Sequence, residues 1–372
     1  MEMGVCKICG MKGALISNKI GTCLECLRQR PEEALKVAQQ LYQTSRTRYG
    51  MPISPPKSPD GILCGLCGNN CRIGEGERGF CGLVTNIGGK LVRLGGTREK
   101  GILEWYYDPH VTNCVAAWFC PAIGTGYPKY AYKNGPEYGY YNLAVFYGSC
   151  SFSCVFCQNY QYKGLTKKLR PTMSAEELAS KVNERVSCIC YFGGDPSSQM
   201  EHAIVTSKIA LERAREDNRI LRICFETNGN MSAGFADTAM QLVLESGGVM
   251  KFDLKFWNET LNLAMCGVSN KVSFENFRRL GEKYFDSRPE VPVLTASTLL
   301  IPGYVDKEEV RKIAEFIAEI SPDIPYSLLA FYPCFELTDL PTTSRKQALE
   351  CLNAAKEAGL RYVRIGNVHL LS

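Results

Sequence analysis

The sequence predicts an α/β fold, a full or partial (β/α) barrel that is preceded by two small cysteine-rich metal-binding segments. Two observations lead to this prediction. From Asn142 onward, short apolar β-rich runs alternate with amphipathic helical stretches, which is typical of parallel strands joined by crossover helices. Before Asn142, cysteines occur in closely spaced pairs, which is typical of metal ligands. A length of 372 residues fits this organisation, since it corresponds to about two or three domains.

Composition narrows the class of protein. The chain is 45% hydrophobic and 22% charged, an ordinary globular profile. Its net charge of +5 arises from 43 basic and 38 acidic residues, a balance that gives only weak support for a nucleic-acid partner. No apolar run reaches about 18 residues, so we expect no membrane partner. The first residues lack the apolar region of a signal peptide, and we therefore expect a cytoplasmic protein whose 19 cysteines stay reduced.

Residues 1–50 form the first expected unit. Four cysteines occur here as two C-x2-C pairs separated by 13 residues, the spacing of zinc ribbons and rubredoxin-type iron sites: Cys6, Cys9, Cys23 and Cys26. We expect them to bind zinc or mononuclear iron, with unmetallated thiols as the alternative. A helix is predicted over 31–49, with Pro31 at its first position. Residues 51–60 contain four prolines and are expected to be a linker.

Residues 61–141 form the second expected unit, which begins with four more closely spaced cysteines: Cys64, Cys67, Cys71 and Cys81. Four thiolates can ligate an auxiliary iron–sulfur cluster or a zinc ion, and their irregular spacing favours neither. The rest of the unit is an aromatic connector, whose tyrosines are expected to pack it onto the barrel or to line a substrate channel. Cys114 and Cys120 in this connector are expected to be buried thiols or extra ligands.

Residues 142–372 form the expected barrel. Apolar runs predict its strands at 143–148, 188–194, 221–229, 249–256, 293–303, 326–332 and 361–366. Amphipathic stretches predict helices at 174–186, 201–216, 232–247, 273–285 and 307–320.

The strongest chemical signal is the C-x3-C-x2-C motif formed by Cys150, Cys154 and Cys157. It directly follows the first predicted barrel strand, at the end where barrels place their active sites. Three thiolates on one tight loop can hold three corners of a cubane iron–sulfur cluster, whereas full ligation requires four. The missing fourth cysteine leaves one iron open to a substrate or cofactor. The alternatives are a zinc loop completed by a distant cysteine, or reduced core cysteines.

From these residues onward the sequence resembles the radical S-adenosylmethionine (radical SAM) superfamily, whose signature is CxxxCxxC. Phe156 matches the aromatic position that packs near the adenine. A second motif resembles the family's GGEP segment, with Asp in place of Glu: Gly193, Gly194, Asp195 and Pro196. The resemblance implies a radical SAM type of barrel. It also implies that this segment binds the amino group of SAM, largely through backbone carbonyls.

Two further strand ends resemble segments of pyruvate formate-lyase activating enzyme. The DTNG-like segment contains Glu226, Thr227 and Asn228, and the DLK-like segment contains Asp253 and Lys255. The resemblance implies that Lys255 contacts the SAM carboxylate. It also implies that Glu226, Thr227 and Asp253 help to bind a monovalent cation near SAM. A left-handed turn and an ordinary strand end are the alternatives. The segments 300–304 and 363–368 resemble late motifs of the same subgroup.

The second cysteine unit resembles the AmmeMemoRadiSam-type group of activating-enzyme-like proteins. Together the resemblances imply a radical SAM enzyme in an anaerobic setting. Its 4Fe–4S cluster, reduced by ferredoxin or flavodoxin, would cleave SAM to methionine and a 5′-deoxyadenosyl radical. That radical would abstract hydrogen from a protein or peptide, as glycyl-radical activases do.

The activase interpretation has one departure, because Tyr332 stands where activating enzymes carry a histidine. Modification of a small molecule or nucleic acid, with auxiliary metal centres, is the first alternative. A non-catalytic, metal-stabilised binding protein is the second.

Overall fold

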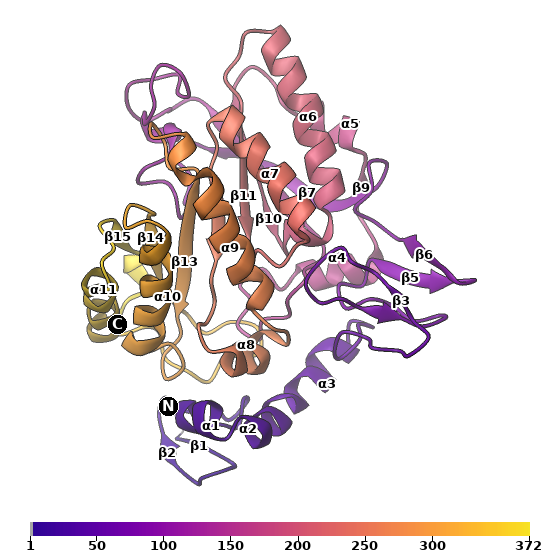
Figure 1. Ribbon diagram of the computed structural model, residues 1–372, viewed down its shortest axis with the longest axis vertical. Coiled ribbons are helices and arrows are strands. Elements are labelled where there is room, and N and C mark those ends of the chain that lie inside the picture. Colours follow the sequence, from indigo (N-terminus) through magenta and orange to yellow (C-terminus); the bar gives the residue numbers. More distant parts are fainter. Residues whose placement is uncertain (1–2) are drawn as a thin grey trace.

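The centre of the protein is a nine-stranded sheet with the strand order β15-β14-β13-β12-β11-β10-β8-β7-β9 (Figure 1). The structure is a computed structural model that describes residues 3–372. Neighbouring strands from β8 to β15 are parallel. They are β8 (Tyr141–Tyr147), β10 (Val186–Gly193), β11 (Arg222–Thr227), β12 (Met250–Asp253), β13 (Leu294–Leu300), β14 (Tyr326–Ala330) and β15 (Val363–Gly366). All seven predicted strands are therefore confirmed. Within residues 3–372 β15 pairs with β14 alone, so the sheet does not close. Of the two expected folds, a full or a partial barrel, the structure shows the partial barrel.

Helices on the outer face of the sheet cover these strands (Figure 1). They are α4 (Tyr162–Lys168), α5 (Ala175–Ala179), α6 (Met200–Glu216), α7 (Ala233–Ser246), α8 (Glu259–Cys266), α9 (Lys271–Tyr284), α10 (Lys307–Ile320) and α11 (Arg345–Glu357). In α10, Val310, Ile313 and Ile317 form the buried face, while Asp306 caps the first turn. The helix predicted over 174–186 is shorter than expected. A capping box at Ser174 starts it, but it ends at Ala179 because the chain turns there to enter β10.

The connector contributes to the sheet. Strand β7 (Gly101–Pro109) pairs antiparallel with β8 and with the short β9 (Thr172–Met173). The sheet thus continues across the unit boundary expected at residue 142. Some connector tyrosines pack, as in the stacked pair Tyr132 and Tyr140 with ring centroids 4.4 Å apart. Others are exposed: Tyr106, Tyr107, Tyr127 and Tyr138. Two small hairpins precede β7, formed by β3 (Ile62–Leu63) with β4 (Arg72–Ile73) and by β5 (Val84–Ile87) with β6 (Lys90–Arg93).

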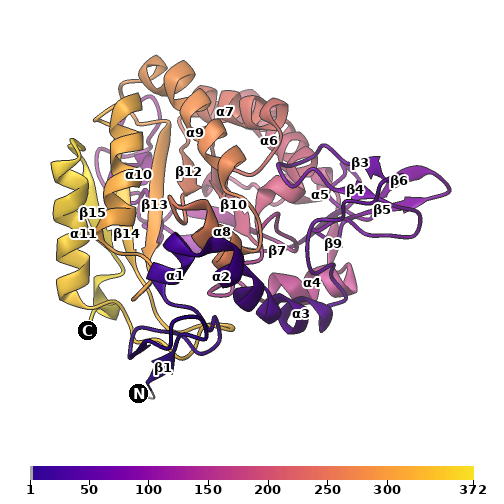
Figure 2. The same ribbon diagram turned by 60° about the horizontal axis from the view of Figure 1, so that its bottom comes forward.

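The N-terminal unit consists of a small hairpin and three helices: β1 (Gly4–Val5), β2 (Lys12–Gly13), α1 (Leu24–Gln29), α2 (Pro31–Ala38) and α3 (Gln40–Thr47). The single helix predicted over 31–49 is therefore divided in two at Gln39. Helices α1 and α2 pack against α8, as Figure 2 shows. The Tyr42 hydroxyl adds a hydrogen bond, 3.1 Å long, to the backbone carbonyl of Ala264 in α8.

The segment 300–304, which resembles a late family motif, holds this N-terminal unit in place. The buried Tyr304 hydroxyl accepts a hydrogen bond from the backbone N–H of Ser17 at 3.0 Å and donates one to the Thr22 carbonyl at 2.8 Å. Gly303 approaches so closely that an added Cβ would lie 2.0 Å from the Leu15 carbonyl oxygen. The backbone at 303 also has φ +79°, which favours glycine.

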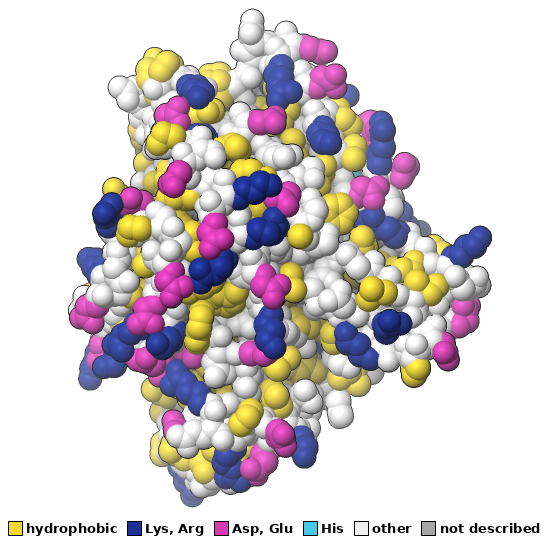
Figure 3. Space-filling view, viewed as in Figure 1, with side chains coloured by type: hydrophobic (Ala, Val, Ile, Leu, Met, Phe, Trp, Pro, Cys, Tyr) yellow, Lys and Arg dark blue, Asp and Glu magenta, His cyan; other side chains and the backbone are white. Residues whose placement is uncertain are grey.

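The surface shows no strong segregation of charge on the face drawn in Figure 3, where basic and acidic side chains are intermixed. This agrees with the nearly balanced composition. Among residues 3–372, none of the helices combines the length and the apolar character that a membrane span needs.

Candidate functional site

The residues that the sequence assigns to a SAM site come together in one cleft at the carboxyl ends of the parallel strands. The cleft encloses about 1570 Å³ of space that includes open solvent. Its lining includes Cys150, Cys154, Phe156, Cys157, Gly193, Gly194, Asp195, Glu226, Thr227, Asn228, Asp253 and Lys255. Of the predicted set, Pro196 lies just behind the cleft, where it begins a short 3-10 helix.

The cysteine loop after β8 is anchored by the end of α8. Backbone N–H groups of Ser153 and Val155 donate to the carbonyls of Cys266 and Met265 at 2.8 and 2.9 Å. Cys266 also places its Sγ atom 3.4 Å from that of Cys154. This contact lowers the pKa of Cys154, whereas burial raises the pKa of Cys157 to about 12.

Asp195 joins the GGDP segment to the end of β11. Its buried carboxylate accepts hydrogen bonds from the Thr227 hydroxyl at 3.0 Å and from the backbone N–H groups of Asn228 and Ser197 at 2.6 and 2.8 Å. Asn228 in turn directs its side-chain amide at the Cys150 sulfur, 3.5 Å away. A hydrogen-bonded path therefore runs from the GGDP segment to the first cysteine of the loop.

The glycine pair lets the end of β10 lie directly against the cysteine loop. A Cβ atom at Gly194 would lie 1.9 Å from the carbonyl oxygen of Ser149, and one at Gly193 would lie 2.5 Å from the backbone nitrogen of Tyr147. Gly193 also has φ +105°. Side chains at both positions are excluded by backbone atoms, so the strand end presents only backbone groups to the cleft.

Two lysines supply positive charge. Lys255 forms an ion pair with Asp253 and lies 5.9 Å from the ring centroid of Phe156. Lys251, which the sequence did not single out, forms an ion pair with Glu226 at 2.9 Å. The two carboxylates expected near a monovalent cation are thus each paired with a lysine, and the cation site stays a prediction.

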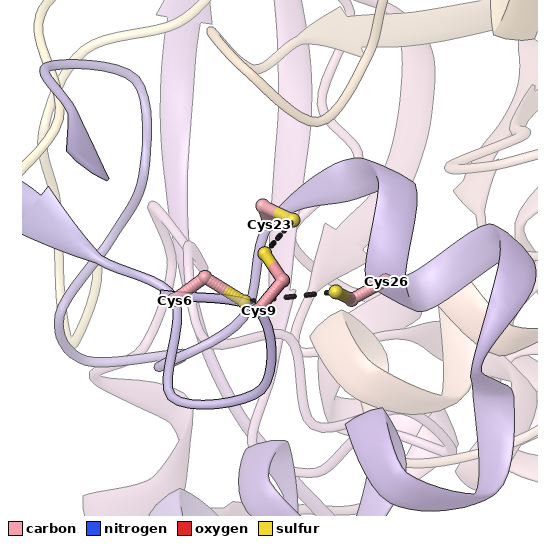
Figure 4. Close-up of side chains that lie close together, drawn as sticks. All are labelled: Cys6, Cys9, Cys23 and Cys26. Carbon is pink, nitrogen blue, oxygen red and sulfur yellow. Dashed lines mark hydrogen bonds between the residues drawn. The ribbon is translucent and has the colours of Figure 1, made fainter. Parts of the chain in front are cut away.

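A separate cysteine group lies in the N-terminal unit (Figure 4). The four sulfur atoms of Cys6, Cys9, Cys23 and Cys26 lie within 4.8 Å of one another, with 3.7 Å between Cys6 and Cys26 and 3.8 Å between Cys9 and Cys23. Thiolates that share one tetrahedral zinc ion at about 2.3 Å require such short separations. The group can hold one metal ion, as its spacing predicts.

The second cysteine unit is arranged differently from the first. Four cysteines line one narrow space together with Ser197 and Ser198, which follow the GGDP segment: Cys64, Cys67, Cys71 and Cys81. Within residues 3–372, only the N-terminal group gathers its ligand atoms within 4.8 Å. This second set and the Cys150 loop are therefore spaced too widely for all their sulfurs to share a single ion.

Several polar residues of the interior have no counterpart in the sequence motifs. Cys266, Lys163 and Lys251 reach the cleft region from separate helices and strands, so no spacing reveals them. The Lys163 side chain is buried beneath the cysteine loop and donates to the Ser153 hydroxyl at 2.9 Å. A usable signal exists for Cys188 and Cys190, whose alternation in a predicted strand places both on one face.

An open parallel α/β sheet thus presents three loop cysteines, a glycine pair and a lysine in one cleft. Residues 144–317 match the model of the Radical SAM superfamily. The chain therefore contains a radical SAM domain, as its sequence predicted.

Two curated proteins of Methanocaldococcus jannaschii are similar to the chain. The uncharacterized protein MJ0808 is 27% identical over 319 residues, which cover 82% of this chain and 81% of that protein. The protein named "Putative glycyl-radical enzyme activating enzyme MJ1632" is 24% identical over 219 residues, which cover 58% of this chain and 75% of that protein.

Solved structures show more distant similarity. A domain of pyruvate-formate lyase-activating enzyme from Bacteroides vulgatus is 23% identical, with a TM-score of 0.38, and the match covers 48% of this chain and 98% of the domain. SuiB from Streptococcus suis bound to S-adenosylmethionine is 13% identical, with a TM-score of 0.43, and the match covers 59% of this chain and 49% of SuiB.

Proposed function

We propose that this protein cleaves SAM reductively and uses the resulting radical to abstract hydrogen from a protein or peptide substrate. The observation that carries the proposal is the single cleft shared by the cysteine loop, the GGDP segment and Lys255. A 4Fe–4S cluster would supply the electron that converts SAM to methionine and a 5′-deoxyadenosyl radical, after reduction by ferredoxin or flavodoxin.

The residues present fit this cofactor. Cys150, Cys154 and Cys157 supply three thiols from one loop, and their sulfurs do not gather as closely as those of a single-ion site. The Asn228 amide donates to the Cys150 sulfur, the kind of hydrogen bond that stabilises a thiolate ligand. Cys150 and Cys154 are buried, which keeps water from the ligand sulfurs.

The surrounding residues suit the parts of SAM. The backbone of Gly193 and Gly194 would receive the amino group, while Lys255 would pair with the carboxylate. Phe156 packs against Phe256 with ring centroids 6.0 Å apart, which holds an apolar surface for the adenine. Asp195 acts as a positioning residue, because its hydrogen bonds to Thr227 and Asn228 fix the strand ends that frame the cleft. Glu226, Thr227 and Asp253 remain the proposed surroundings of a monovalent cation.

The proposed substrate class rests on the activating-enzyme relative, together with the strand-end segments that resemble such enzymes. Tyr332, which stands where activating enzymes carry a histidine, is 36% exposed and does not line the cleft. A protein substrate would have to present an extended segment to the cleft, because only a chain end or loop can enter an enclosed site.

The test uses anaerobically reconstituted protein, SAM and dithionite. Wild type is expected to form 5′-deoxyadenosine, and the Cys150→Ala/Cys154→Ala/Cys157→Ala variant is expected to form none. Cys351→Ala is the matched control, because Cys351 is a buried cysteine of α11 outside the cleft, and it should retain activity. Absence of 5′-deoxyadenosine from iron-loaded wild type would overturn the proposal.

A further inference from the structure

A second cavity adjoins the SAM cleft on the inner face of the sheet and encloses about 700 Å³ of space that includes open solvent. It lies between strands β8, β10, β11 and β12 and the connector residues 110–122. Five cysteines line it: Cys114, Cys120, Cys188, Cys190 and Cys224. The cavity and the cleft share lining residues, among them Cys114 and Lys251, so the two spaces are adjacent.

The sheet's geometry brings these cysteines together. Cys188 and Cys190 are two positions apart on β10, so both side chains point to the same face. The parallel register places Cys224 of β11 directly beside Cys190. The connector then covers this face, because Cys114 and Cys120 precede and begin a short 3-10 helix at Pro121–Ile123.

Buried positive charge faces the thiols. The Lys251 ammonium lies 3.1 Å from the sulfurs of both Cys114 and Cys190, and its side chain is only 3% exposed. Arg222 on β11 also lines the cavity, where it forms a buried ion pair with Glu137 at 2.6 Å. Burial raises the pKa of both Cys114 and Cys190, and the Lys251 ammonium offsets part of that effect.

The spacing of the sulfurs discriminates between a single ion and a cluster. Two thiolates on one zinc ion cannot be farther apart than about 4.6 Å, twice the zinc–sulfur distance. Within the described part of the chain, no three of these cysteines gather their sulfurs within 4.8 Å, in contrast to the Cys6 group. Among the described residues the Cys150 loop likewise has no three sulfurs within 4.8 Å, and a polynuclear cluster spreads its ligand sulfurs farther apart than a single ion does.

We propose that this cavity binds an iron–sulfur cluster through thiolates drawn from the connector and from β10 and β11. The site is distinct from the Cys150 loop and from both N-terminal cysteine units. Lys251 would lie against the cluster and offset the negative charge of its thiolate ligands. The proposal concerns occupancy of the cavity and stands independently of SAM cleavage.

The test removes the Cys150-loop site first, so that the proposed SAM cluster does not contribute. In the Cys150→Ala/Cys154→Ala/Cys157→Ala background, protein is reconstituted anaerobically with iron and sulfide, with and without Cys188→Ala/Cys190→Ala/Cys224→Ala. Iron and sulfide per chain are measured and the iron is characterised by Mössbauer spectroscopy. The additional substitutions are expected to remove one cluster's content, about two to four iron atoms per chain. Cys351→Ala in the same background is the matched control and should lose none.

A second variant guards against misfolding of the sheet. Cys114→Ser/Cys120→Ser alters only the connector and should also lower the iron content or change the Mössbauer parameters. Unchanged iron, sulfide and spectra in both variants would overturn the proposal and identify the cavity as a thiol-lined binding pocket. If the additional substitutions lower the iron content but wild-type protein does not cleave SAM, the proposed function is overturned and the cluster proposal stands.

Discussion

The sulfur of Cys266 lies 3.4 Å from the sulfur of Cys154, although 112 positions separate the two residues. Cys266 is the last residue of α8, the helix against which α1 and α2 of the N-terminal unit pack. One helix thus contacts both the proposed cluster loop and the N-terminal four-cysteine unit. This relationship links two parts of the molecule that the sequence presents as separate.

Replacing Cys266 is expected to shift the reduction potential of the cluster at the Cys150 loop. Hydrogen bonds to cluster sulfurs raise the potential because they stabilise the more negative reduced state. Loss of one hydrogen bond of about 1 kcal/mol in Cys266→Ala corresponds to roughly 40 mV toward more negative values for one electron. An EPR-monitored potentiometric titration measures the shift. Cys266→Ser keeps a donor and should stay near wild type, and an unshifted Cys266→Ala would refute this role.

Gly194→Ala is expected to weaken SAM binding. The new methyl group would lie 1.9 Å from the Ser149 carbonyl oxygen, so the end of β10 must move away from the cysteine loop. A displacement that costs at least about 1.4 kcal/mol weakens binding tenfold or more. Equilibrium binding of SAM to the reconstituted protein tests this. Gly234→Ala in α7 is the control, because an added Cβ there meets no atom within 4 Å, and equal affinities for the two variants would contradict the expectation.

Tyr304→Phe is expected to loosen the N-terminal unit. The substitution removes two hydrogen bonds and leaves the Ser17 N–H and the Thr22 carbonyl without these partners, which costs about 1–3 kcal/mol. Thiol-reagent labelling of Cys6 and Cys23 in metal-free protein should become faster. Tyr284→Phe removes a tyrosine hydroxyl that bonds Asp237 at 3.3 Å on a distant helix, and it should leave the labelling rate unchanged. Identical rates in both variants would exclude Tyr304 from this role.

Cys26→Ser is expected to release one equivalent of metal from the N-terminal unit. Cys26 is buried in α1 and contributes one of the four clustered sulfurs, so its loss leaves an incomplete tetrahedral set. Metal analysis should show one zinc or one mononuclear iron fewer per chain, while acid-labile sulfide stays constant because no cluster is lost. Cys351→Ser serves as the control. A fall in sulfide would instead place a cluster at this site.

The alternation of apolar runs and amphipathic stretches was sufficient to predict seven parallel strands, because each strand's signal is local. The addition of β7 to the same sheet was not predictable in this way, since an antiparallel edge pairing depends on how the connector folds back onto β8. The sequence also did not predict the division of the 31–49 helix at Gln39 or the early end of α5, for a similar reason. Both depend on where the following segment is anchored.

The candidate site divides along the same line. The loop cysteines, the glycine pair and Lys255 belong to short motifs, so the sequence alone predicted that they share one site. Cys266, Lys251 and the cysteines of β10 and β11 come from separate elements and become neighbours only through the sheet register. Their side chains are individually ordinary for buried positions, and only the fold shows that they share a space.

The most direct measurement is the EPR spectrum of the reduced protein, recorded with and without SAM, for wild type and for the Cys150→Ala/Cys154→Ala/Cys157→Ala variant. A cluster with one open iron at this loop must change its spectrum when SAM binds, so wild type is expected to show a SAM-dependent shift that the variant lacks. A wild-type spectrum that is indifferent to saturating SAM, or a shift that persists in the variant, would contradict the assignment of the Cys150 loop as the SAM-binding cluster site.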